Sequence, residues 1–493
     1  MEQRAHIRVG PPVANPLPSY WQDPKSPLAA VIEPSVDNAT ESYDFAIIGS
    51  GISGTLIAYN LLLANPSYRI VMLEAREICS GATGRNGGHT KAASYRSYAQ
   101  HVRDLGKEEA LKIARWEWEN IRAMHGLARE LGIECGSETC RTVDVVYDQE
   151  TFEAGKKGIE MLQGDVRKDE REEGEMAWYK IYEKEEALGR GCQVAEKNEN
   201  PEVGGEEKVV GMFEYMAGRI HAYHFTTGVL KKCVEKGLLL CAKTPVHEIR
   251  SSSRSDPGGQ LLWDVFTQYN TITTRNVVLA TNGYTSYLER ALHGAIVPMR
   301  GQITLQRPGS ANKLACPLPT TYSSIYRDGY EYMIPCPLAD GSQYIIIGGG
   351  LGRLPSAGAS EYGTVDDSSL NPVISKYLQG SLPGYFGSEN WGETAKQDSS
   401  ERVVQEWTGI MGATADGRPF VGEVPRKKGM WIAAGFNGHG MVLCLKSAEA
   451  LVKMIEAGGG AGKPRWFPEG FMITDERVSK CVFRGRTDMR VTV

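Results

Sequence analysis

A glycine-rich turn between an apolar run and an apolar helical stretch constrains this chain more than any other part of its sequence. The run 45–48 has the composition of a buried strand, the stretch 55–63 that of a buried helix, and 68–73 that of a second strand, which ends on Glu74. Three glycines at the first junction fit the pattern Gly-x-Gly-x-x-Gly: Gly49, Gly51 and Gly54. Strand, turn, helix, strand and acid together predict a βαβ unit that binds a dinucleotide.

Each part of this unit has a chemical reason. One glycine allows the tight turn, the next lets the backbone approach a pyrophosphate, and the last lets the helix pack closely on the strand. The N-terminus of the helix carries positive partial charge that attracts the pyrophosphate. Glu74 can accept hydrogen bonds from a ribose hydroxyl, so it disfavours a 2′-phosphate there. The alternative is a glycine loop that binds nothing.

Composition argues against several other classes of protein. A chain of 493 residues exceeds one small core, so two or more domains are expected, and 41% hydrophobic residues fit a soluble globular protein. The formal net charge of −5 argues against a nucleic-acid partner. No apolar run is long enough to cross a membrane, and residues 1–39 contain no apolar signal core, so a cytoplasmic location is expected. The ten cysteines lack paired spacing, which favours reduced thiols over disulfides or a metal site.

Two further segments are expected to meet the same ligand. The apolar strand 276–279 ends in the small residues Ala280, Thr281 and Asn282, and strands of an open α/β sheet point their carboxyl ends at the ligand crevice. A second glycine-rich junction, residues 435–440, follows the apolar strand 430–434 and opens a helix with an apolar face. Its free N–H groups and positive helix end would face an electron-rich group. The alternative is a helix cap without a ligand.

Four blocks of sequence together resemble the D-amino-acid oxidase-like FAD-dependent oxidoreductases, a superfamily that includes glycine oxidase, sarcosine oxidase and gamma-glutamylputrescine oxidase. The blocks are the turn 49–54 with Glu74, Gly-Arg-Asn-Gly-Gly-His at 84–89, Arg-Gly-Gln at 300–302, and Trp-Thr-Gly at 407–409 running to 435–441. The block at 84–89 looks most like the gamma-glutamylputrescine oxidase branch and its fungal relatives.

This resemblance implies an α/β chain (α+β overall) with a Rossmann-like FAD-binding domain and an interleaved antiparallel-sheet substrate domain. An extended N-terminal arm, 1–40, would come first. The other predicted parts are a discontinuous FAD-binding domain (41–98, 211–290 and 405–460), a substrate or cap domain (99–210 and 291–404) and a C-terminal extension (461–493).

The resemblance also implies FAD, with its contacts gathered in three places. Those expected at the diphosphate and adenosine are Gly49, Ser50, Gly51, Ile52, Ser53, Gly54, Glu74, Ala75, Arg76 and Val246, with Ala280, Thr281 and Asn282 at the crevice. Those expected at the pyrophosphate, ribityl chain and ring edge are Thr83, Gly84, Arg85, Asn86, Gly87 and Gly88. Those expected at the ribityl and pyrimidine end are Asp416, Phe436, Asn437, Gly438, His439, Gly440 and Met441.

Attachment of the FAD is expected to be non-covalent. Some sarcosine oxidases bind flavin through a cysteine ahead of the turn that resembles Asp416, but residues 407–415 contain no cysteine. A covalent bond through His89 stays open, because a few relatives make a histidyl bond near this position.

The implied reaction is oxidation of a C–N bond in an amine or amino acid. Hydride transfer to flavin N5 gives an imine, and reoxidation of the flavin by O2 gives H2O2. Three alternatives stay open on this fold: a secondary-metabolite tailoring flavoenzyme, a flavin dehydrogenase with another electron acceptor, and a flavin-binding protein without catalysis. An NAD-dependent dehydrogenase is the nearest chemical rival, and the substrate and oligomeric state are left open.

The residue types around the glycines suggest roles in this reaction. His89 or Lys91 would supply a positive charge near the O2 that reoxidises the flavin. Alternatively, Lys91 is an ordinary solvated lysine and His89 a histidine that is hydrogen-bonded to the backbone. Arg300 is the candidate anchor for a substrate carboxylate, with Arg327 as an alternative that could instead form a turn ion pair. Three aromatic residues are candidate walls of the pocket or else core: Tyr330, Tyr332 and Trp407.

Overall fold

A parallel sheet carries the first glycine turn in the computed structural model, which describes residues 1–31, 42–256, 258–395, 399–459 and 462–485. Strand β1 (Tyr43–Ile48) lies between β10 (Thr271–Leu279) and β2 (Ile70–Leu73) and is parallel to both. The sheet order is β16-β17-β10-β1-β2-β7, with β9 on β10 and β8 on β9. Its other strands are β7 (Leu239–Cys241), β8 (Val246–Ser255), β9 (Leu261–Thr267), β16 (Phe420–Glu423) and β17 (Met430–Ala434).

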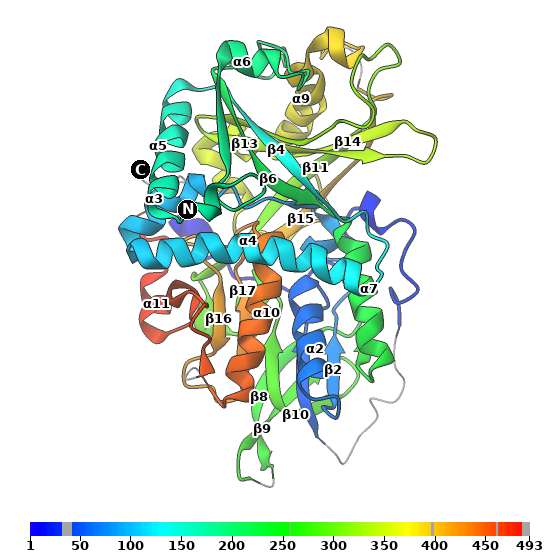
Figure 1. The fold of residues 1–493 in the computed structure, drawn as a ribbon. Helices are drawn as coiled ribbons and strands as arrows, with labels where there is room; N and C mark the ends of the chain where they lie inside the picture. The colour runs from blue at the N-terminus through cyan, green and yellow to red at the C-terminus, as the bar shows by residue number, and fades with distance from the viewer. Residues whose placement is uncertain (32–41, 257, 396–398, 460–461, 486–493) are drawn as a thin grey trace.

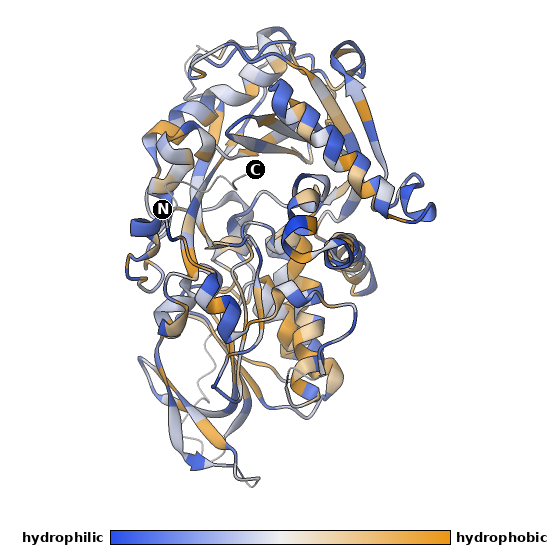
Figure 2. Cartoon of the chain, turned by 90° about the vertical axis from the view of Figure 1, so that its left-hand side faces the viewer, coloured by the Kyte–Doolittle hydropathy of each residue, from blue (hydrophilic) through white to orange (hydrophobic). Residues whose placement is uncertain are grey.

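Three helices cover one face of this sheet (Figure 1): α2 (Ile52–Ala64), α7 (Ala222–Glu235) and α10 (Gly440–Glu456). Helix α2 packs against both of the others. Apolar side chains on these helices, such as Leu56, Phe225 and Leu451, are fully buried in one core with the sheet. Figure 2 shows the same helices mostly in the hydrophobic colour. Burial of this apolar surface is the main force that fixes the layer.

The predicted βαβ unit is confirmed, and its glycines stand where no side chain fits. Gly49 has φ +105°, and a Cβ there would lie 2.6 Å from the carbonyl oxygen of Ala280. A Cβ on Gly54 would lie 2.0 Å from the carbonyl oxygen of Gly49. Helix α2 can therefore approach β1 and β10 only because both positions are glycine.

A second, largely antiparallel sheet stands above the first in Figure 1, as the resemblance implies. Its order is β15-β11-β14-β13-β12-β4-β6-β3, with β5 on β6 and one parallel pair, β12 and β4. The strands are β3 (His89–Thr90), β4 (Glu138–Val146), β5 (Tyr179–Glu183), β6 (Gly211–Arg219), β11 (Ile296–Gln306), β12 (Thr321–Tyr326), β13 (Gly329–Pro337), β14 (Gln343–Gly348) and β15 (Val403–Thr414). The remaining helices are α1 (Glu2–Ala5), α3 (Tyr95–Leu105), α4 (Lys107–Glu130), α5 (Gln149–Asp165), α6 (Lys184–Gly189), α8 (Thr285–Leu288), α9 (Pro372–Trp391) and α11 (Asp475–Lys480).

The fold class is confirmed, whereas the predicted domain boundaries stay predictions. Strands β6 and β15 fall within segments assigned by sequence to the FAD-binding domain, yet they belong to the second sheet. Residues 32–40 of the predicted arm, and 461 and 486–493 of the predicted extension, lie outside the described residues. The described part of the arm is held to the body by Trp21, which is buried and packs edge-on to His221 with ring centroids 4.5 Å apart.

Three features are absent from the described residues: a membrane-spanning helix, a metal-ion cluster and a disulfide. No helix in this part of the chain is long and apolar enough to span a membrane. No cluster of side chains within the described ranges could hold a metal ion. All ten cysteines are free thiols, and most are buried.

Gly54→Ala should lower the free energy of unfolding by about 1–3 kcal/mol, because the new methyl group overlaps the backbone of Gly49 and forces α2 away from the sheet. Gly126, in the C-terminal part of α4, is the matched control, since a Cβ there meets no atom within 4 Å. Gly126→Ala should raise the free energy of unfolding by up to about 1 kcal/mol through helix propensity. Denaturant unfolding measures both, and equal stability of the two variants would contradict the close approach.

Candidate active site

Two adjoining cavities lie along the carboxyl edge of the parallel sheet. The smaller has a volume of about 190 Å³ and the larger about 440 Å³. They share five lining residues, so they form one elongated space: Ala82, Asn86, Met411, Gly438 and Met441. The strands β1, β2, β10 and β17 are parallel, which brings their carboxyl ends to the same edge. This is the edge at which open α/β sheets bind ligands.

The two glycine-rich junctions face the same cavity. Gly49 and Gly51 of the first junction and Phe436 and Gly440 of the second all line the smaller cavity. Helices α2 and α10, which follow the junctions, pack side by side, and Ser53 Oγ donates a hydrogen bond to Cys444 Sγ at 3.1 Å. Segments almost 400 residues apart therefore converge on one ligand space.

Glu74 completes the smaller cavity. Its Oε2 accepts hydrogen bonds from the backbone N–H of Ser50 at 3.1 Å and from Ser50 Oγ at 2.7 Å. Its Oε1 accepts one from the N–H of Arg76 at 3.1 Å. The carboxylate is thus fixed at the end of β2 while it still lines the cavity, as recognition of a ribose hydroxyl requires.

The residues present fit a dinucleotide. The backbone at Gly49 and Gly51 is bare at the N-terminus of α2, where a diphosphate is favoured. The hydroxyl of Tyr284, which also lines the smaller cavity, is buried and has no hydrogen-bond partner in the described structure. A bound polar group would satisfy this hydroxyl. Sequence reasoning missed Tyr284, although it follows directly on the predicted crevice residues that end at Asn282.

Most residues proposed from the sequence line one or both cavities. Those from the cofactor set are Gly49, Gly51, Ile52, Ser53, Glu74, Ala75, Arg76, Thr83, Arg85, Asn86, Gly87, Gly88, Val246, Ala280, Thr281, Asn282, Phe436, Asn437, Gly438, His439, Gly440 and Met441. Those from the catalytic set are His89, Lys91 and Tyr332. Six proposed residues line neither cavity: Ser50, Gly54, Gly84, Arg300, Trp407 and Asp416.

Several of these six support residues that do line the cavities. Trp407 is fully buried and donates its indole N–H to the carbonyl oxygen of Arg85 at 2.8 Å. Ser50 fixes Glu74, as described above. A Cβ on Gly84 would lie 2.3 Å from the carbonyl oxygen of Cys79, so Gly84 shapes the loop that leads to the larger cavity.

Lys91 lies in the wall of the larger cavity with its ammonium group fully engaged. It donates hydrogen bonds to Thr142 Oγ1 at 3.0 Å, to Ser323 Oγ at 2.9 Å and to the carboxylate of Asp144. An ammonium group has three donors, so none is left over. Asp144 is completely buried, and burial alone would raise its pKa. The charges of Lys91 and Arg96 outweigh burial and lower the pKa of Asp144 below its ordinary value.

His89 is joined to the same network. Its Nε2 lies 2.7 Å from Thr321 Oγ1, and the Thr321 hydroxyl lies 2.9 Å from that of Thr142, which Lys91 contacts. Burial, and secondly the charge of Lys91, lowers the pKa of His89 well below its ordinary value. The imidazole is therefore neutral at physiological pH and can hydrogen-bond without adding charge.

Arg96, at the start of α3, is a cavity residue that sequence reasoning missed. Its guanidinium carbon lies 4.2 Å from the centroid of the Tyr330 ring, and both side chains line the larger cavity. Among the described residues, no ion pair involves Arg96. The feature of the sequence that could have indicated Arg96 is its position shortly after the 84–89 block. Helical spacing alone, however, does not show which way the Arg96 side chain points.

The two arginines proposed as anchors are engaged elsewhere. Arg300 donates from Nε to Glu361 Oε2 at 2.7 Å and from Nη1 to Ser369 Oγ at 3.0 Å. Its neighbours Gly301 and Gln302 line the larger cavity, whereas Arg300 does not. Arg327 is exposed and pairs with Asp148 at 3.2 Å.

Comparison with known proteins agrees with this geometry. A family model described as FAD dependent oxidoreductase (DAO) matches residues 44–454. The probable oxidoreductase OrdL of Haemophilus influenzae is 22% identical over 82% of this chain and 80% of its own length. The glycine oxidase of Geobacillus kaustophilus is 22% identical over 85% of this chain and 94% of its own length.

Solved structures share the fold. The crystal structure of Geobacillus kaustophilus glycine oxidase superposes with a TM-score of 0.66 at 20% identity, covering 88% of this chain and 99% of that one. A structure of the L-amino acid deaminase of Proteus vulgaris gives a TM-score of 0.61 at 17% identity, covering 91% of this chain and 98% of that one. The fold and family predicted from the sequence are confirmed. The chain is an enzyme of the DAO family of FAD-dependent oxidoreductases, with FAD as its cofactor.

Proposed function

We propose that this enzyme is an oxidase of a C–N bond in an amine or amino-acid substrate, with an imine as the product. The observation that carries the proposal is the single elongated space in which a narrow, glycine-lined part continues into a wider cavity of about 440 Å³ that is lined by both apolar and polar residues. FAD bound in this space would supply the redox chemistry: it would take up a hydride from the carbon next to nitrogen and pass the electrons to O2, which would give H2O2. The names of two relatives, a glycine oxidase and an L-amino acid deaminase, support an amino-acid-like substrate.

Residues of the narrow part would hold the cofactor. Gly49 and Gly51 leave room for the diphosphate at the N-terminus of α2, and Glu74 would bind the ribose. The N-terminus of α10 begins at Gly440, beside the shared wall of the two cavities, and its positive partial charge would stabilise electron density on the flavin ring.

The wider part would hold the substrate. Lys91 and Asp144 compensate each other, and His89 is neutral, so none of them gives the cavity net charge. Arg96 adds a positive charge to the lining and Asp328 a negative one, and the Arg96 guanidinium is the group best placed to bind a carboxylate. Tyr330 holds the guanidinium by a cation–π contact while leaving its edge N–H groups available.

Wild-type protein should release its FAD into the supernatant on acid precipitation, because the attachment is non-covalent; yellow colour in the pellet would show a covalent bond.

Gly51→Ala should abolish FAD retention, because the added methyl group would crowd the diphosphate proposed to bind at this turn; its Cβ would also lie 3.2 Å from Thr83 Oγ1. Flavin absorbance per mole of protein measures this, with Gly126→Ala as the control. Full occupancy in Gly51→Ala would contradict the assignment of the turn.

Arg96→Ala should raise KM about tenfold or more for a substrate that carries a carboxylate, because one charge-assisted pair is lost. KM for an amine without a carboxylate should change little. The control is Arg327→Ala, whose side chain is 67% exposed. A panel of amines and amino acids, followed by both peroxide release and dye reduction, measures this and separates an oxidase from a dehydrogenase. An equal change for both substrate classes would remove Arg96 as the anchor.

Asp144→Asn should lower the free energy of unfolding by about 3–5 kcal/mol, because it leaves the Lys91 ammonium buried without its counter-charge. The matched control is Asp475→Asn, which breaks an exposed ion pair with Arg426 and should cost less than about 1 kcal/mol. Denaturant unfolding of the FAD-free protein measures both. Similar values for the two variants would show that the Lys91–Asp144 pair does not stabilise the cavity wall.

A further inference from the structure

We propose that Arg477, in helix α11 near the C-terminus, is a positioning residue that fixes the cavity-facing turn at Asn437 through Asp416 and Thr414. The proposal rests on FAD as the cofactor and on the second glycine junction as part of its site. It concerns a residue that contacts neither cavity, so its effect must pass through the polar contacts between Arg477 and the turn.

The turn at Asn437 has a backbone that needs support. Asn437 has φ +51°, in the left-handed region that few residues other than glycine adopt, and Gly438 next to it has φ +78°. Both residues line the larger cavity, and Gly438 lines the smaller one as well. Helix α10 begins two residues later, at Gly440. A shift of this turn would move the helix N-terminus together with the cavity wall.

Contacts of the Asn437 side chain hold the turn against the end of β15. Its Oδ1 accepts a hydrogen bond from the backbone N–H of Thr414 at 2.8 Å. Its Nδ2 donates to Thr414 Oγ1 at 3.1 Å and to the carbonyl oxygen of Gly435 at 2.7 Å. The hydroxyl of Thr414 in turn donates to the carbonyl oxygen of Arg418 at 2.9 Å. Asn437 therefore takes its position from Thr414.

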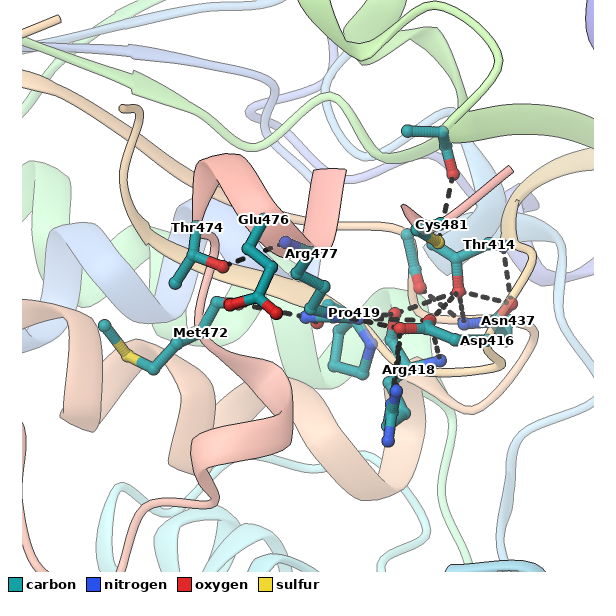
Figure 3. Close-up of polar contacts among 12 residues, drawn as sticks. Thr414, Asp416, Arg418, Pro419, Asn437, Met472, Thr474, Glu476, Arg477 and Cys481 are labelled. Atoms are coloured by element: carbon teal, nitrogen blue, oxygen red, sulfur yellow. Dashed lines mark hydrogen bonds and ion pairs between the residues drawn. The ribbon is translucent and has the colours of Figure 1, made fainter. Parts of the chain in front are cut away.

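Arg477 binds the other side of this network (Figure 3). Its Nη2 donates at 2.8 Å to the carbonyl oxygen of Arg418, the same atom that Thr414 contacts. Its Nε and Nη2 reach the two carboxylate oxygens of Asp416 at 2.8 Å and 3.1 Å, in a bidentate pair. Its Nη1 donates to the carbonyl oxygen of Pro419 at 2.8 Å, and the guanidinium lies 4.1 Å from the centroid of the Phe420 ring. One side chain thus fixes the whole turn 416–420.

Asp416 has its own role in this arrangement. Besides Arg477, it accepts hydrogen bonds from the N–H of Arg418 at 3.1 Å and from Arg418 Nη2 at 3.0 Å. Burial opposes its ionisation, but the hydrogen bonds and charge of Arg477, followed by those of Arg418, lower the pKa of Asp416 to about 2. The carboxylate is therefore ionised at physiological pH. Its stabilising effect is present above the unfolded pKa of about 4 and is lost as the pH falls towards 2.

The sequence-based role of Asp416 changes as a result. The resemblance places Asp416 beside the ribityl chain; in the structure Asp416 lines neither cavity, and its carboxylate binds Arg477. Asp416 and Arg477 act as a pair that orders the turn before FAD arrives. A site ordered in advance binds more tightly, because less conformational entropy is lost on binding.

The test compares Arg477→Gln with Arg426→Gln. Arg426 also pairs with an acidic residue of α11, Asp475, but this pair is on the surface and does not reach the turn. FAD titration of the stripped protein, followed by flavin fluorescence, should give a dissociation constant raised about tenfold or more in Arg477→Gln and unchanged in Arg426→Gln. Amide hydrogen exchange of the FAD-free protein should be faster at residues 435–441 in Arg477→Gln only.

Thr414→Val provides a second variant that leaves the Arg477–Asp416 pair intact. It removes only the Thr414 hydroxyl, which joins Asn437 to the carbonyl oxygen of Arg418 and also lies 3.2 Å from Asp416 Oδ1, and it should produce the same local rise in exchange. The double variant Arg477→Gln with Thr414→Val should have an FAD dissociation constant no higher than that of whichever single variant binds FAD less tightly. The reason is that both substitutions break the same link.

Three outcomes would overturn the proposal. Wild-type FAD affinity in Arg477→Gln is the first, and unchanged exchange at 435–441 is the second. The third is a rise in exchange spread over the whole chain together with a lower unfolding temperature, which would give Arg477 a role in stability alone. Failure of the wild-type protein to bind FAD would instead contradict the cofactor assignment, while the exchange comparison would still test the link from Arg477 to the turn.

Discussion

The close backbone approach between the first glycine turn and the end of β10 is the constraint on which the nucleotide-binding half depends. No side chain fits at Gly49 or Gly54, because the carbonyl oxygens of Ala280 and Gly49 occupy the space. This approach lets α2 sit directly on β1 and β10, and α10 then packs on α2. The N-termini of the two helices consequently open on one space, where their positive partial charge favours an electron-rich group.

The second sheet adds a cavity wall whose charges are largely compensated. Lys91 with Asp144 and Arg300 with Glu361 are buried or partly buried ion pairs, and Arg85 lies 3.7 Å from Asp367. Buried charges need such partners because desolvation is costly. Arg96 is instead held by an aromatic ring, which compensates a cation only weakly. This contrast makes Arg96 the cation through which the cavity can select its ligand.

Support for the cofactor site comes from parts of the chain that are remote in sequence. Trp407 fixes Arg85 from β15, and Arg477 fixes the turn at Asn437 from the last helix. Pro11 and Pro12 of the N-terminal arm line the smaller cavity. Both ends of the chain thus contribute to a site whose main contacts come from the two glycine-rich junctions.

The sequence by itself determined the family, the cofactor and the element order, because these depend on local patterns. Period-two and continuous apolar runs gave the strands, and the glycine spacing gave the turn. The structure adds two local details. Helices α3 and α4 are separated at Gly106, which adopts φ +84°. Strand β10 begins at residue 271, so the apolar run 276–279 is only its second part.

Only the tertiary structure decided which polar side chains face the ligand. Arg96 and Arg300 are the same residue type near similar glycine-containing segments, yet Glu361 engages one and the cavity receives the other. Asp416 and Lys91 likewise lie next to ligand-binding segments while their charged groups turn to Arg477 and Asp144. Partners such as these are brought together by packing of distant elements. The spacing of residues in the sequence does not predict these partners, because the direction of a side chain depends on which other parts of the chain pack beside it.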